Sequence, residues 1–109
     1  MGSAPDRVIE ELRRFRRRVS KRYKVQRMIL FGSRARGKTH EFSDVDLILV
    51  SPWFRRRGAI SRAYPMHLEW DLGYPVDFLC YTPEEFRRLS ARAGPVREAL
   101  REGIEISEA

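Results

Sequence analysis

Residues 28–50 read MILFGSRARGKTHEFSDVDLILV: two apolar runs joined by a polar connection that starts at Gly32. The runs at residues 25–31 and 44–50 are short and rich in strand-forming side chains, so we predict a strand for each. The second run is apolar on both faces after Asp46, which favours a central position in a sheet. The connection between the two strands decides the fold, because it fits two different phosphate-binding patterns.

The first pattern is a P-loop, since GSRARGKT at residues 32–39 matches GxxxxGK[ST]. A P-loop opens a helix that crosses back over the sheet, and such a crossover needs about 10 to 12 residues or more. Only residues 40–44 separate Thr39 from Val45. The second carboxylate of a P-loop also ends an apolar strand, whereas Asp44 and Asp46 begin one. We therefore expect the match to be accidental.

The second pattern places the phosphate contacts at Gly32 and Ser33. A glycine at a strand end allows a sharp turn and a close approach of the backbone to a ligand. Ser33 adds an amide and a hydroxyl at the start of a helical turn, where the helix dipole favours phosphate. Residues 34–36 fit one such turn, and it presents Arg36 as a further phosphate ligand.

Three carboxylates are candidates for metal binding. Asp44 and Asp46 are two residues apart on a strand, so their side chains leave the same face about 6 to 7 Å apart. Carboxylate oxygens are the hard ligands that Mg²⁺ prefers, with nucleotide phosphates completing its shell. Asp77 enters the apolar run VDFLCY, where a lone buried carboxylate is costly without a compensating charge. We expect the three to converge at one end of the sheet and to hold two metal ions.

The rest of the chain supplies helices for both faces of a small mixed sheet. Apolar residues at helical spacing predict an amphipathic helix over residues 6–22. Residues 53–65 read as a mobile loop leading into a short helix over residues 66–72. After a third strand at 76–81, Thr82 and Glu85 form a capping box that starts a helix. A last helix at 95–102 precedes a possible edge strand within 103–107. This order indicates an α/β or α+β sandwich.

The length and composition of the chain limit the class of protein to which it can belong. The 109 residues suit one domain, so we expect a single domain over residues 1–109. No apolar run of about 18 residues could span a membrane, and the charged start of the chain is unlike a signal peptide, so we expect a cytoplasmic protein. The net charge of +7, carried largely by arginine, favours an anionic ligand or an acidic partner. A solvated helix face would explain the arginines of residues 13–18 equally well.

Three stretches together resemble the minimal nucleotidyltransferases of the DNA polymerase β-like superfamily. They are FGSRARG at residues 31–37, SDVDLILV at 43–50 and PVDFLCYTPEEF at 75–86. The resemblance covers most of the chain from Gln26 to Leu89 and implies a polymerase β-like nucleotidyltransferase fold. The basic segment Phe54 to Arg62 departs from the family pattern.

The resemblance implies a role for each candidate residue. Gly32 and Ser33 would hold the nucleotide phosphates, and Asp44 and Asp46 would bind two Mg²⁺ ions. Asp77 would complete the metal site and help to activate the attacking hydroxyl. Family members of this size are often encoded beside a small helical partner of the HEPN type, as a toxin and antitoxin pair.

We therefore expect a magnesium-dependent enzyme that moves a nucleoside monophosphate, AMP from ATP, to an acceptor hydroxyl on a partner protein. Residues 53–65 are the candidate docking surface, because arginine and aromatic side chains are enriched at interface centres. Two alternatives stay open: a binding module that neutralises a HEPN-type toxin, and a nucleic-acid-binding domain. The acid triad favours the enzyme, and the lack of a helix-turn-helix, zinc or aromatic-sheet signature argues against the nucleic-acid module.

Overall fold

The computed structural model describes residues 6–35 and 44–108. The helices in this part of the chain are α1 (Asp6–Tyr23), α2 (Ala59–Glu69), α3 (Pro83–Ser90) and α4 (Pro95–Glu102), with a short 3₁₀ turn, η1 (Pro52–Phe54). The strands are β1 (Arg27–Phe31), β2 (Val45–Val50), β3 (Val76–Tyr81) and β4 (Ile104–Glu105). None of the helices in these residues is long and apolar enough to cross a membrane.

The strands form one mixed sheet in the order β3-β2-β1-β4. β1 is antiparallel to both β2 and β4, whereas β2 and β3 are parallel. The predicted central position of β2 and the predicted edge strand near the C-terminus are both confirmed. A helical crossover joins parallel strands, so the antiparallel pairing of β1 with β2 is incompatible with a P-loop between them.

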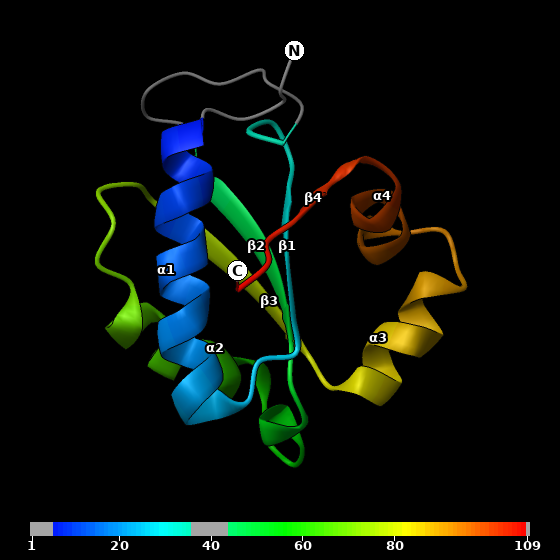
Figure 1. Cartoon of the computed structure of the whole chain (residues 1–109). Coiled ribbons are helices and arrows are strands. Elements are labelled where there is room, and N and C mark those ends of the chain that lie inside the picture. The colour runs from blue at the N-terminus through cyan, green and yellow to red at the C-terminus, as the bar shows by residue number, and fades with distance from the viewer. Residues whose placement is uncertain (1–5, 36–43, 109) are drawn as a thin grey trace.

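Helices cover both faces of this sheet, giving an α+β architecture of three layers (Figure 1). α1 and α2 lie on one face, where Leu12, Phe15 and Met66 pack on the inward side chains of the strands. α3 and α4 lie on the other face, where Phe86 and Val96 pack against a smaller cluster. The alternation of side chains along β2 assigns odd-numbered residues to the α1 face and even-numbered residues to the α4 face.

The prediction for residues 53–72 is wrong in its boundaries. The structure has the turn η1 and then α2 from Ala59 to Glu69, although Pro65 lies inside that helix. Tertiary contacts outweigh the low helix propensity of proline: Met66 is fully buried, and the Arg62 guanidinium binds both Cys80 O and the Glu85 carboxylate. The helix ends because Trp70 adopts extended backbone angles, and its indole N–H donates to Tyr74 O.

The arginines of α1 are not a uniformly solvated face. The Arg16 side chain is buried and donates to the carbonyls of Ile106 and Gln26, which holds the C-terminal segment against α1. Arg18 donates to the carbonyl of Glu69 and pairs with Asp71 at 2.8 Å. Part of the basic charge therefore stabilises the fold, since hydrogen bonds from charged donors to carbonyls are among the stronger ones.

Candidate functional site

The site begins where β1 ends. The chain turns at Gly32 with φ +78°, a conformation that L side chains rarely adopt, and residues 33–35 continue as a turn. A β-carbon built on Gly32 would overlap Oδ2 of Asp46. Glycine is therefore required here both by the backbone angle and by the close approach of a carboxylate.

The turn after Gly32 is anchored from two sides. Ala35 is buried in the core on the α1 face, and the Arg34 guanidinium lies 4.6 Å from the centre of the Tyr74 ring. Ser33, between Gly32 and Arg34, is partly exposed. The other predicted phosphate ligand, Arg36, lies outside the described residues, as do Lys38 and Thr39.

Two of the predicted metal ligands are neighbours across the sheet. Asp46 is the register partner of Asp77 on one side and of Phe31 on the other. Residues directly opposite each other in a sheet present their side chains on the same face. Asp44 precedes Asp46 by two residues, which places it on that face as well. The face is the one covered by α3 and α4.

The three acids influence one another electrostatically. The pKa of Asp46 is raised above its usual value, first by partial burial and then by the negative charges of Asp77 and Asp44. Each of these effects disfavours the ionised form of Asp46. A divalent cation would offset the burial and the repulsion together.

The donor set fits such a cation by its chemistry, because it consists of hard carboxylate oxygens. Residues 6–35 and 44–108 nevertheless contain no group of three His, Cys, Asp or Glu side chains spaced to hold one metal ion. Asp46 and Asp77 are brought together as expected, and Asp44 lies just before β2. Asp77 is exposed, as is Asp44, so the expectation of a buried carboxylate at Asp77 is wrong. The metal-binding roles of all three stay predictions.

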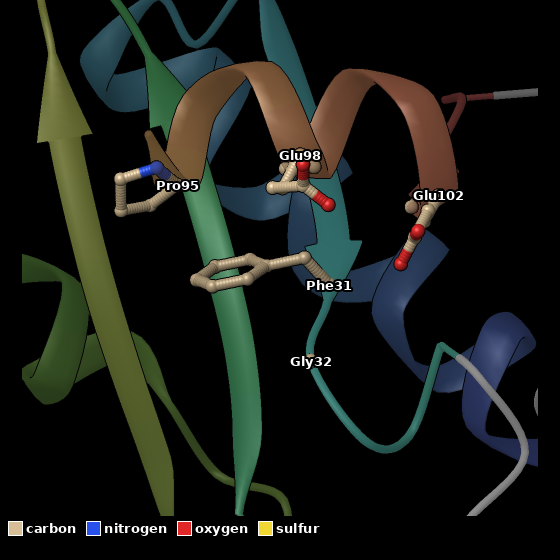
Figure 2. A pocket seen from close by; sticks show the side chains of 7 residues that line it. Phe31, Gly32, Pro95, Glu98 and Glu102 are labelled. Carbon is tan, nitrogen blue, oxygen red and sulfur yellow. The ribbon is translucent and has the colours of Figure 1, made fainter. Parts of the chain in front are cut away.

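A pocket lies beside these acids, between the end of β1 and α4, with a volume of about 140 Å³ (Figure 2). Phe31 and Gly32 form its floor, and Pro95, Glu98 and Glu102 of α4 line the opposite side. Sequence reasoning missed the contribution of α4. One signal was available: Glu98 and Glu102 are four residues apart, and like charges at this spacing destabilise an isolated helix.

Cys80 does not act as a nucleophile at this site. Its side chain faces the α1 side of the sheet, away from Asp46 and Asp77, and packs against the core there. Burial raises the pKa of the thiol to about 12, so little reactive thiolate is present near neutral pH.

Comparison with known proteins gives one family. Residues 12–106 match the sequence profile described as "Nucleotidyltransferase domain". Two curated relatives, bifunctional uridylyltransferase/uridylyl-removing enzymes from two strains of Caulobacter vibrioides, are each 31% identical over 81 residues, covering 73% of this chain. The chain spans only 9% of the length of these relatives.

A solved structure supports the same fold. It is a crystal structure at 1.40 Å resolution of a Sulfolobus solfataricus protein provisionally assigned as a nucleotidyltransferase. It aligns with a TM-score of 0.65 at 19% identity and covers 91% of this chain and 78% of that one. The expected nucleotidyltransferase fold, a small mixed sheet flanked by helices, is confirmed.

Proposed function

The chain belongs to the nucleotidyltransferase domain family, and we propose that it transfers AMP from ATP to an acceptor hydroxyl, releasing pyrophosphate. The observation that carries this proposal is the row Gly32, Asp46, Asp77 at one end of the sheet. Asp46 and Asp77 are register partners, and Gly32 contacts Asp46 only because it has no side chain. A phosphate-binding turn thus lies directly beside two carboxylates.

The phosphates of the nucleotide would lie on the turn after β1. The amide and hydroxyl of Ser33 donate to phosphate oxygens, and Gly32 lets the backbone approach them closely. Arg36 would add a charge-assisted hydrogen bond, as its place in the sequence predicts. The fixed position of the turn, packed through Ala35 and Arg34, orients the α-phosphorus in front of the acids.

Nucleotidyltransferase domains generally use a divalent metal, and we propose that Asp44, Asp46 and Asp77 hold two Mg²⁺ ions. When bound, the metal neutralises phosphate charge and lowers the pKa of the attacking hydroxyl. The acceptor oxygen forms a bond to the α-phosphorus as the bond to the leaving pyrophosphate breaks. Asp77, which reaches the site from the neighbouring strand, would chiefly serve the metal that activates the acceptor, and the hydroxyl proton would leave to solvent.

We propose that the acceptor hydroxyl belongs to a small helical partner protein of the HEPN type. The supporting observation is an apolar stripe on α2, made of Ile60, Tyr64 and Leu68, which are 84%, 61% and 68% exposed. The spacing of four residues places all three on one side of the helix. The stripe overlaps the segment that the sequence predicts as a docking surface. It equally favours a second candidate function, a module that neutralises the partner by binding alone.

Three variants separate the roles of the acids and test the enzyme against the binding module. Asp44→Asn and Asp46→Asn should weaken magnesium-ATP binding as well as transfer, because both carboxylates hold the metal that accompanies the triphosphate. Asp77→Asn should bind magnesium-ATP within a few-fold of wild type but lose transfer by ~100-fold or more. Calorimetric titration measures magnesium-ATP binding. A single-turnover assay, with the protein that co-purifies with this chain as acceptor, measures transfer.

Asp71→Asn is the matched control, since Asp71 is an exposed aspartate that pairs with Arg18 of α1, the helix on the opposite face of the sheet from the acids. It should leave ATP binding and transfer unchanged. Normal transfer by Asp77→Asn would show that this carboxylate is only structural. Undiminished partner binding with no transfer by the wild type would favour the binding module.

A further inference from the structure

The pocket between β1 and α4 adjoins the proposed phosphate and metal site, and no role has been assigned to it so far. We propose that it seats the base of the donor nucleotide, with Phe31 as the stacking surface and Glu98 as the side chain that selects a 6-amino or 4-amino group. This assignment rests on the proposed function. It would make Glu98 the residue that favours adenine or cytosine over guanine or uracil.

The position of the pocket supports a part of the same nucleotide. Gly32 both lines the pocket and contacts the carboxylate of Asp46. Phe31, the main surface of the floor, is the register partner of Asp46 in the sheet. The pocket therefore opens directly beside the place proposed for the α-phosphate, where the nucleoside must begin.

The chemistry of the walls fits a flat, mostly apolar group. The Phe31 ring lies beneath α4, with Pro95 and Glu98 above it (Figure 2). Aromatic side chains stack on nucleobases without strong sequence preference. A triphosphate would be repelled, because Glu98 and Glu102 both line the pocket. The negative charges of Glu98 and Glu102 thus favour placement of the phosphates on the Gly32 side and of the base in the pocket.

Glu98 has capacity for a ligand although it contacts a neighbouring arginine. Arg101 donates to Glu98 at 3.4 Å and lies 3.5 Å from the Glu102 carboxylate. An ionised carboxylate only accepts hydrogen bonds and offers about four lone-pair positions, so an amino group can share Glu98 with Arg101. Adenine and cytosine carry an amino group where guanine and uracil carry a carbonyl. A carboxylate attracts the first pair and repels the second.

The test measures binding of ATP, UTP and inorganic tripolyphosphate by calorimetry, in the presence of magnesium. Wild type should bind ATP roughly tenfold or more tightly than UTP, the scale of one hydrogen bond to a charged group. Glu98→Gln should reduce this preference to within about threefold, because an amide both donates and accepts. Phe31→Leu keeps an apolar side chain and should weaken ATP and UTP together while leaving tripolyphosphate binding unchanged.

Arg101→Gln is the matched control, because it breaks the same ion pair on α4 but keeps the Glu98 carboxylate. It should preserve the preference for ATP. The proposal is overturned if ATP binds no more tightly than tripolyphosphate, or if Glu98→Gln leaves the ratio of ATP to UTP affinity unchanged. Binding of tripolyphosphate in those cases would leave the proposed function intact. Failure of all three ligands to bind would overturn both.

Discussion

At the scale of single residues, Gly32 is the position at which backbone and site depend on each other. Gly32→Ala places a methyl group where Oδ2 of Asp46 lies, and its positive φ adds a strain of ~1 kcal/mol. We expect a modest fall in melting temperature and a loss of magnesium-ATP affinity of about tenfold or more. Thermal unfolding and calorimetry measure the two effects.

Gly73→Ala serves as its control, because a β-carbon on Gly73 meets no atom within 4 Å. This variant should bind magnesium-ATP as wild type does. If Gly32→Ala also kept its full affinity, the carboxylate of Asp46 would not be needed where the structure places it.

The buried thiol gives a second prediction for a single residue. Because burial raises the pKa of Cys80 to about 12, the native protein should react with a thiol reagent at pH 8 at least tenfold more slowly than the unfolded chain. The native rate should rise with pH, as the thiolate fraction grows. A fast native reaction at pH 8 would show that the strand β3 opens readily and exposes this side chain.

At the scale of elements, the ion pair between Arg62 and Glu85 ties α2 to the start of α3. Arg62 donates to both carboxylate oxygens, at 2.6 and 3.1 Å, and Glu85 also accepts from the Thr82 amide in the capping box. The hydrogen bond from Arg62 is the main cause that lowers the pKa of Glu85 from 4.5 to about 2. The same pair holds the helix that sequence reasoning placed incorrectly.

The sign of this shift sets a pH dependence. The folded-state pKa is below the unfolded value, so the stabilisation is present above pH 4.5 and is lost as the pH falls toward 2. Glu85→Gln should lower the free energy of unfolding at pH 7 by about 1–2 kcal/mol, allowing for solvent screening. The difference from wild type should shrink below pH 4.5. Urea unfolding at several pH values measures it.

Glu84→Gln is the control for that series, because Glu84 pairs with Arg55 on an exposed surface. We expect little change in stability from this variant at any pH. An equal loss from both variants would show that the capping box and its partly buried arginine contribute no more than an ordinary surface pair.

Local patterns predicted most of the elements but not the ones that depend on distant contacts. The capping box at Thr82 and the strand that is apolar on both faces after Asp46 are encoded within a few residues, and both are confirmed. The start of α2 was missed because Gly58 and Pro65 read as breakers, whereas Met66 and Arg62 gain their contacts from other elements.

The candidate site likewise combines features that local sequence predicts with features that depend on distant contacts. The sequence predicted that Asp46 and Asp77 converge at one end of the sheet, and the structure makes them register partners. The pocket residues on α4 could not be predicted, because β4 must first pair with β1 to bring that helix over Phe31.

At the scale of the whole molecule, two surfaces could meet a macromolecular acceptor. The exposed Arg56 and Arg57 shortly precede α2, which carries the apolar stripe. Exposed apolar patches on small proteins commonly mark interaction sites. Along α1, a basic surface formed by Arg14, Arg17, Arg18 and Lys21 lines a shallow groove. The first surface suits a helical protein with an acidic rim, and the second suits a nucleic acid.

A labelling experiment distinguishes which of these two surfaces binds the acceptor. Wild type is incubated with ATP labelled at the α-phosphate and with the protein encoded by the neighbouring gene. The label should appear on a hydroxyl side chain of that second protein. Replacing Ile60 and Leu68 together by serine should abolish labelling while magnesium-ATP affinity stays within about twofold, because the stripe lies outside the nucleotide site. Replacing Arg14 and Lys21 by serine should leave the labelling unchanged. If RNA ends were labelled in place of the protein, and the α1 variant alone lost that activity, the acceptor would be a polynucleotide held by its phosphates.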